Sequence, residues 1–137
     1  MTCLDPATQI ALRQRLRDIM ARVPLKVRYQ PEAPADGAAS SDEHVARFLA
    51  RHRGHNEFRR VGGWLSFDRQ EQGVVMARRV CPHWVVGDGE DAMIDVTPRP
   101  QPHEVYRFHA HDDDQADFAR LYRLVCAPID LQRGVDY

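Results

Sequence analysis

The first part of the chain shows apolar side chains at a spacing of three or four residues. These positions are Leu12, Leu16, Ile19, Met20 and Val23. That spacing places them on one face of a helix. Asp5 is suited to the N-cap and Pro6 to the first helical position, and Pro24 ends the helix. The alternating segment from Leu25 to Tyr29 is expected to form a short strand.

Two further segments have helical periodicity. The first is expected to begin near Ser40 or Ser41, either of which can cap it, and to end at Arg53-Gly54. The second is expected to start at Asp112-Asp113-Asp114, whose carboxylates suit the positive end of a helix. Their expected buried side chains are Val45, Phe48 and Leu49 in the former and Phe118, Leu121, Tyr122 and Val125 in the latter.

Between these helices the hydrophobic period changes to two, which indicates β-strands. The predicted strands cover residues 58–68, 74–80, 82–86, 92–97 and 105–108. The order of elements predicts an α+β fold, an antiparallel sheet of four to five strands with helices packed on it. Residues 1–137 are expected to form one domain. Its first part, residues 1–30, holds a helix and a short strand, and residues 40–125 form the core.

The predicted hairpin of residues 82–97 has the most informative pattern. If its turn holds an odd number of residues centred on Gly89, Trp84 faces Ile94 and one face of the hairpin is wholly apolar. A shift of one residue would place polar side chains among these apolar ones. The pattern therefore favours the odd turn.

The same register places His83 directly opposite Asp95 on the other face of the hairpin. Their Cβ atoms would be about 4.5–5.5 Å apart, which allows a hydrogen bond between the side chains. A carboxylate that orients a histidine is the base half of a nucleophilic site. The alternative is a structural His–Asp pair on a half-exposed sheet face.

Ser41 and Cys81 are the two candidates for the nucleophile. Ser41 stands at the start of the second predicted helix, where the helix dipole favours an anion, although a hydroxyl gains less than a thiol would. Its alternative role is an N-cap. Cys81 lies two residues before His83, about 6.5–7 Å along the strand, and a bulge near Pro82 could shorten that distance. Its alternative role is that of a small, half-buried apolar residue.

A series of short motifs is spread over residues 40–118. They are Ser41-Asp42-Glu43-His44-Val45, Gly54-His55, Gly63-Trp64-Leu65, His83-Trp84-Val85-Val86, Asp88-Gly89, Ile94-Asp95-Val96-Thr97-Pro98, Phe108 and His111. Together they resemble a small bacterial family with a Cys-His-x-Asn-Val-like helix start and an Ile-Asp-x-Thr-Pro strand. The histidine strand and the Asp-x-Thr strand also resemble the transglutaminase-like, papain-like superfamily, in which a cysteine on a helix N-terminus faces a histidine and an aspartate on adjacent strands.

This resemblance implies a transglutaminase/papain-like core with His83 as general base and Asp95 as its orienting carboxylate. Ser41 falls where the cysteine stands in that family, and Asp42 and His44 replace the His and Asn beside it. The implied function is acyl transfer or hydrolysis on a peptide or small amide, altered by the serine at the nucleophile position. The alternative is a non-catalytic module on the same scaffold that binds a peptide or protein.

A substrate groove beside His83 is a further possibility. Gly62-Gly63 allows a close backbone approach next to the large ring of Trp64. Trp64, His44 and Trp84 are the residues expected to line such a groove. The same pattern is also typical of a strand that bends over a core tryptophan.

A metal site is the third hypothesis. His109 and His111 would share one strand face and are followed by Asp112-Asp113-Asp114, whereas zinc requires three or four convergent ligands. A strand end followed by an acidic helix start explains the same residues. We therefore expect no metal, and because no phosphate loop or dinucleotide fingerprint is present, no cofactor.

Composition and charge limit the classes of partner that the chain is expected to bind. Apolar residues make up 43% and charged residues 28% of the chain, which is typical of globular domains. The net charge of −1 shows no basic excess, so no nucleic-acid partner is expected. No apolar run approaches the ~18 residues of a membrane span. Three widely spaced cysteines, Cys3, Cys81 and Cys126, are expected to be free thiols in a cytoplasmic protein.

Overall fold

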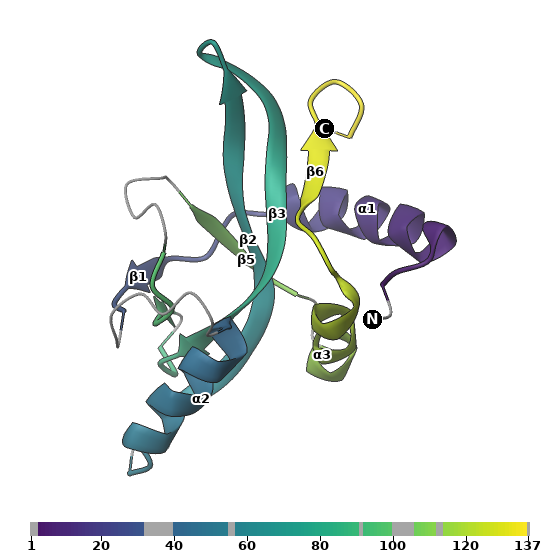
Figure 1. Ribbon diagram of the computed structural model, residues 1–137. Helices are drawn as coiled ribbons and strands as arrows, with labels where there is room; N and C mark the ends of the chain where they lie inside the picture. Colours follow the sequence, from purple (N-terminus) through teal and green to yellow (C-terminus); the bar gives the residue numbers. More distant parts are fainter. Residues whose placement is uncertain are drawn as a thin grey trace.

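The computed structural model describes residues 3–31, 40–54, 57–90, 92–99, 106–111 and 114–136. These residues form an α+β structure in which helices pack on a mixed sheet (Figure 1). The elements in chain order are α1 (Pro6–Met20), β1 (Val27–Tyr29), α2 (Ser41–Arg51), β2 (Arg59–Glu71), β3 (Val74–Gly87), β4 (Met93–Asp95), β5 (Arg107–Ala110), α3 (Gln115–Leu124) and β6 (Ile129–Gln132).

The sheet has the strand order β1-β4-β3-β2-β5, and β6 pairs with β3 beside β4. The strand pairs are antiparallel except β1 and β4, which are parallel, with Tyr29 opposite Asp95. The prediction of a wholly antiparallel sheet of four to five strands is therefore wrong on two counts. The described residues contain one parallel pair, and the sheet has six strands because β6 was not anticipated. Two of the four β6 side chains, Asp130 and Gln132, are polar, so its apolar signal is weak.

The three helices begin where side-chain caps are available. Asp5 accepts a hydrogen bond from the amide of Thr8 at 2.7 Å, as predicted for the first helix. Ser40, rather than Ser41, caps α2, and Asp114 caps α3. Asp112 and Asp113, predicted at the start of the third helix, lie outside the described residues.

β2 and β3 form a long hairpin whose far end extends past the helices in Figure 1. β3 continues through Pro82, although the sequence pattern predicted two separate strands there. The N–H of Trp84, two residues on, points away from β2 toward Ser41. Because backbone direction repeats every two residues along a strand, the nitrogen of Pro82 also points away from β2. Proline has no N–H, but no hydrogen bond between β3 and β2 is lost at this position.

Apolar side chains are buried on both faces of the sheet. The larger cluster lies under α1, α2 and α3 and includes Trp64, Trp84 and Phe118. The smaller cluster lies on the opposite face and is made of Val61, Leu65, Val85, Met93 and Phe108. The second face, which was half-exposed in the alternative of a structural His–Asp pair, is thus partly a core of its own. None of the helices in the described part of the chain is long and apolar enough to cross a membrane.

Gly62 and Gly63 allow close packing across β2, as their adjacent positions suggested. A Cβ atom on Gly62 would overlap the ring of Phe118. A Cβ atom on Gly63 would overlap the carbonyl oxygen of His109 and the ring of Phe108. At Gly63 the obstacle is partly the backbone of β5, which cannot move as a side chain can.

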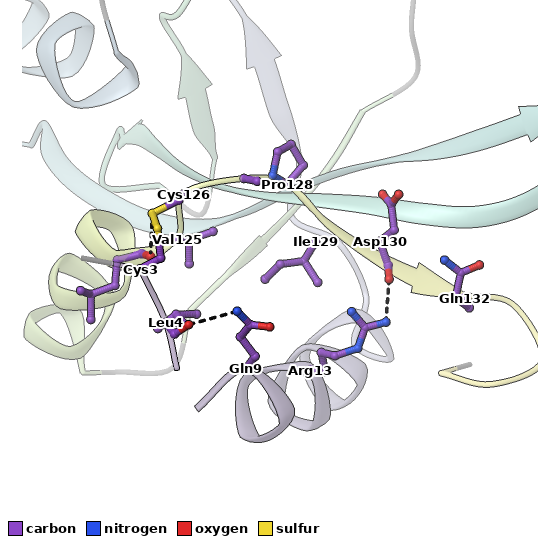
Figure 2. A pocket seen from close by; sticks show the side chains of 12 residues that line it. Cys3, Leu4, Gln9, Arg13, Val125, Cys126, Pro128, Ile129, Asp130 and Gln132 are labelled. Carbon is purple, nitrogen blue, oxygen red and sulfur yellow. Dashed lines mark hydrogen bonds between the residues drawn. A yellow bond between two sulfur atoms is a disulfide. The ribbon is translucent and has the colours of Figure 1, made fainter. Parts of the chain in front are cut away.

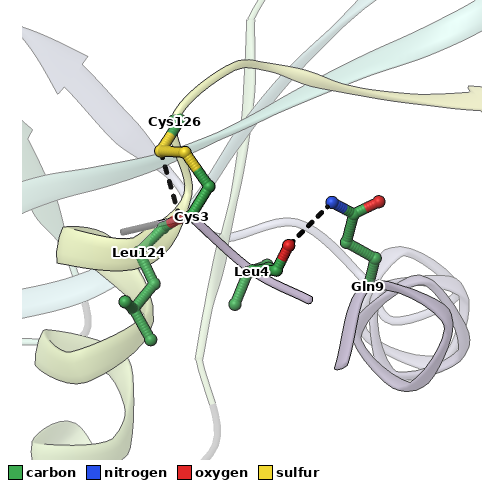
Figure 3. The surroundings of a disulfide bond; sticks show 5 residues. All are labelled: Cys3, Leu4, Gln9, Leu124 and Cys126. Atoms are coloured by element: carbon green, nitrogen blue, oxygen red, sulfur yellow. Dashed lines mark hydrogen bonds between the residues drawn. A yellow bond between two sulfur atoms is a disulfide. The ribbon is translucent and has the colours of Figure 1, made fainter. Parts of the chain in front are cut away.

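Cys3 and Cys126 form a disulfide that joins the segment before α1 to the end of α3 (Figure 3). Their Cα atoms lie 5.7 Å apart although 123 residues separate them in sequence. The prediction of three free thiols is therefore wrong, and among the described residues only Cys81 is free. The cytoplasmic assignment loses its support, because disulfides are typical of oxidising compartments.

We expect Cys3→Ser/Cys126→Ser to lower the free energy of unfolding by about 2–5 kcal/mol, because cross-linking a long loop restricts the unfolded chain. Urea denaturation under oxidising and reducing conditions measures this. Reductant should destabilise the native protein and leave the double variant unchanged. Equal stability of native protein and variant in oxidising buffer would contradict the expectation.

A second expectation concerns Gly63. Gly63→Ala should destabilise the protein by about 1–3 kcal/mol, because the new methyl group meets the backbone of β5. Thermal denaturation of the variant, with Gly54→Ala as control, provides the measurement. Apart from its chain neighbours, no atom of the described residues lies within 4 Å of a Cβ at Gly54, so a loss of stability there reports only on the backbone conformation.

Candidate functional site

His83 and Asp95 are joined by a hydrogen bond of 2.9 Å between Nε2 and Oδ1. The predicted pair is therefore confirmed, although the register differs from the predicted one. Val86, not Trp84, pairs with Ile94, so the turn is displaced by one residue and Asp95 lies diagonal to His83. A shift of two in the pairing preserves which face each side chain occupies. The contact between His83 and Asp95 was therefore predicted correctly although the predicted register was wrong.

The Asp95 carboxylate is fully buried, with 0% exposure. Besides His83, it accepts hydrogen bonds from the amide of Thr97 at 3.2 Å and from Nε and Nη2 of Arg99 at 3.2 and 2.9 Å. Burial is the largest single influence on the pKa of Asp95 and raises it. The hydrogen bonds and charges of His83 and Arg99 together outweigh burial, so the pKa lies below its usual value. Asp95 is therefore an anion at neutral pH.

Arg99 is held in place from two sides. Its guanidinium carbon lies 4.4 Å from the ring centroid of Tyr29 and 4.5 Å from that of Tyr106. The backbone amide of Arg99 donates to the hydroxyl of Tyr29 at 2.8 Å. The parallel pairing of β1 with β4 brings Tyr29 to this position. The contact of Arg99 with Asp95 was not predicted, since its only signal in the sequence is its place four residues after Asp95.

The contact with Asp95 determines the tautomer of His83. An ionised carboxylate only accepts hydrogen bonds, so Nε2 of the imidazole carries the hydrogen. In the neutral ring Nδ1 then holds the free lone pair. Within the described part of the chain, Nδ1 has no hydrogen-bond partner, and the side chain is 11% exposed. His83 is thus equipped to take up a proton at Nδ1.

Ser41 is the first residue of α2 and lies beside the next residue of the histidine strand. Its Oγ accepts a hydrogen bond from the backbone amide of Trp84 at 3.1 Å and shares one of 3.2 Å with the hydroxyl of Tyr122. The Ser41 hydroxyl therefore contacts the backbone directly after His83, but no hydrogen bond joins these two described residues. The structure thus brings two members of the predicted triad into direct contact and places the hydroxyl of the third at the backbone amide of the residue that follows His83.

Cys81 has no activating partner in the described structure. Burial raises the pKa of its thiol, and the nearby charge of Arg79 opposes that only in part. The pairing of β2 with β3 is regular around Pro82, because the one register shift lies between Arg69 and Gln70. The bulge that would have moved Cys81 toward His83 is therefore absent at that position.

Trp64, His44 and Trp84 do not line a groove. Their exposed fractions are 0%, 2% and 6%, so all three belong to the interior. The prediction of a substrate groove at these residues is wrong, because the large rings pack under the helices. Arg60 covers the ring of Trp84 from the solvent side. Its guanidinium carbon lies 5.1 Å from the ring centroid, and the group forms an ion pair with Asp42.

His109 and His111 share a strand face, but three of their four ring nitrogens already have partners, and Nδ1 of His109 is buried with none among the described residues. Nδ1 of His111 accepts from Nε1 of Trp64 at 3.1 Å, so its Nε2 carries the hydrogen and contacts Asp117 at 3.0 Å. Nε2 of His109 lies 3.0 Å from the carbonyl oxygen of Arg22. Burial lowers the pKa of His109. Within the described ranges no three His, Cys, Asp or Glu residues are placed to hold a metal ion.

Comparisons with known proteins add no assignment: no family model matches the chain, and no curated protein or solved structure matches it. The resemblance to the transglutaminase-like superfamily therefore stays a prediction.

We expect Asp95→Asn to destabilise the protein at pH 7 by about 3–5 kcal/mol, because Arg99 and His83 would lose their buried anion. The folded pKa of Asp95 is below its unfolded value, so its stabilisation is complete above about pH 4 and is lost as the pH falls through the folded pKa. The difference between native protein and variant should therefore shrink in acid.

Urea denaturation at pH 7, 5 and 3 gives that comparison. Asp18→Asn, on the exposed face of α1, is the matched control and should cost little at any pH. A difference between native protein and Asp95→Asn that is the same at pH 3 and pH 7 would show that the charge of Asp95 does not stabilise the fold.

Proposed function

We propose that the chain is an acyl-transfer or hydrolysis domain of the transglutaminase-like kind, acting on an amide of a peptide or small molecule. One observation carries the proposal. Asp95 holds His83 through Nε2 and leaves Nδ1 free, while the amide of the adjacent Trp84 holds the hydroxyl of Ser41 at the N-terminus of α2. A base and its orienting carboxylate are thus in contact, and a hydroxyl lies at the backbone amide that follows the base.

The reaction would begin when Ser41 Oγ turns from the amide of Trp84 toward Nδ1 of His83. Nδ1 takes the hydroxyl proton as Oγ attacks the carbonyl carbon of the amide. His83 then gives that proton to the leaving amine as the carbon–nitrogen bond breaks, which leaves an ester on Ser41. Water completes hydrolysis, or a second amine completes transfer. Backbone N–H groups at the start of α2 are suited to the oxyanion.

A second candidate function is a non-catalytic module that binds a peptide or protein. The surroundings of Ser41 favour this non-catalytic function, because the residue is only 7% exposed and its hydroxyl already has two hydrogen-bond partners. In this case the His83–Asp95 pair is a structural contact between β3 and β4.

Ser41→Cys distinguishes the two functions. In a Cys81→Ala background, the new thiol should react with iodoacetamide near pH 6 about tenfold faster than the thiol of Ser40→Cys. The reason is that the side chain of residue 41 contacts the backbone amide that follows His83, whereas that of Ser40 contacts the amide of Glu43. Adding His83→Ala should remove this advantage. Rates are measured by mass spectrometry, after circular dichroism has shown that each variant is folded.

The native serine is tested with a fluorophosphonate, which modifies activated serine hydroxyls. Modification at Ser41 that is lost in His83→Ala supports the enzyme. If Ser41→Cys reacts no faster than Ser40→Cys and the fluorophosphonate leaves Ser41 unmodified, the catalytic proposal is wrong and the binding module is retained.

A further inference from the structure

A pocket of about 560 Å³ lies between the segment before α1, the end of α3 and the strand β6 (Figure 2). Its volume is within the range of about 300–1,000 Å³ that is typical of small-molecule sites. Neither His83, Asp95 nor Ser41 lines it. The pocket is therefore separate from the candidate catalytic site, and what it binds does not depend on the function proposed above.

One side of the pocket is apolar. Leu4, Val125, Pro128 and Ile129 line it together with the disulfide of Cys3 and Cys126. Leu4, Val125 and Ile129 also pack against the main core, so this wall is anchored from behind. The disulfide fixes the segment that carries Leu4 to the end of α3 (Figure 3). A hydrocarbon group of a ligand would find a preformed surface here.

The other side of the pocket carries Arg13. Its Nη2 donates to the carbonyl oxygen of Asp130 at 2.7 Å and to Oδ2 of Asp136 at 2.9 Å, and Figure 2 shows the first of these bonds. These bonds orient the guanidinium group, whose side chain is 36% exposed. Among the described residues, Nε and Nη1 of Arg13 form no hydrogen bond. The N–H groups on these two nitrogens can therefore donate to a ligand.

The charges around Arg13 favour an anionic ligand. Asp130 is held by Arg69 at 3.0 Å and by Arg79 at 2.9 Å, and Asp136 is held by Arg13 itself. Both carboxylates are therefore already paired. Arg17 is a further guanidinium group, whose charge helps to lower the pKa of Asp136, and Arg69 also pairs with Glu71 at 3.7 Å. Four guanidinium groups thus stand against three carboxylates in this network. The net positive charge attracts an anion and repels a cation.

We propose that this pocket binds a small apolar carboxylate, with the hydrocarbon part along Leu4, Val125 and Ile129 and the carboxylate on the free edge of Arg13. The ligand could be a free carboxylic acid or the C-terminal carboxylate of an apolar peptide. Both present the same chemistry to the pocket, and the experiment separates them.

The test uses octanoate, octylamine and octan-1-ol as probes of one chain length and three charge states. Binding is followed by isothermal titration calorimetry and amide chemical shifts in the oxidised protein. Octanoate should bind about tenfold more tightly than octan-1-ol, since a charge-assisted contact adds to the same apolar burial. Octylamine should bind most weakly. Acetyl-Leu-Leu with a free carboxylate, compared with its amide, tests the peptide source.

Three variants locate the site. Arg13→Gln should remove the preference for octanoate over octan-1-ol, whereas Arg13→Lys, which keeps the charge, should retain part of it. Ala127→Trp, at an exposed position on the rim, should block both probes without replacing a core residue. Circular dichroism confirms that each variant is folded.

The proposal is overturned if octanoate shifts no resonance of the pocket residues, or if octylamine binds as tightly as octanoate. It is overturned as well if folded Ala127→Trp binds octanoate like the native protein. Because none of these measurements involves Ser41 or His83, their failure leaves the catalytic proposal untouched.

Discussion

A carboxylate with no exposure to solvent is costly to bury unless each of its oxygens is satisfied, and Asp95 meets that condition. Its donors come from three separate places: the imidazole of His83 on β3, the amide of Thr97 after β4, and the guanidinium of Arg99. The contact with Arg99 in turn depends on Tyr29 of β1. One buried anion thus links β1, β3 and β4 with the segment that follows them.

This constraint gives His83 the orientation that catalysis would need. Because Asp95 accepts the hydrogen on Nε2, the lone pair of the neutral ring is confined to Nδ1. The geometry of the His83–Asp95 pair is therefore the same whether the pair is structural or catalytic. What separates them is the hydroxyl of Ser41, which contacts Trp84 and Tyr122 instead of the imidazole. Whether that hydroxyl can leave its partners is what distinguishes the two proposed functions.

The open edge of β3 explains why Ser41 lies where it does. β6 pairs with β3 as far as Val80, and β4 pairs with it only from Val86 on. The amide of Trp84 lies between these stretches and would be buried without a partner, which is costly. The hydroxyl of Ser41 satisfies it. The same features that attach α2 to the sheet thus bring the start of that helix to the histidine strand.

Local periodicity and capping were sufficient to predict most of the elements and the faces of their side chains. Asp5 at the first cap, the start of the second helix and the His83–Asp95 pair were all predicted on that basis. Register was less certain: apolar alternation fixes only its parity, and a shift of two residues leaves every face unchanged. The tertiary structure alone decided the parallel pairing of β1, the added strand β6, the disulfide of Cys3 with Cys126 and the burial of Trp64. Each of these depends on segments far apart in sequence coming together, and no local pattern records which partner a segment will meet.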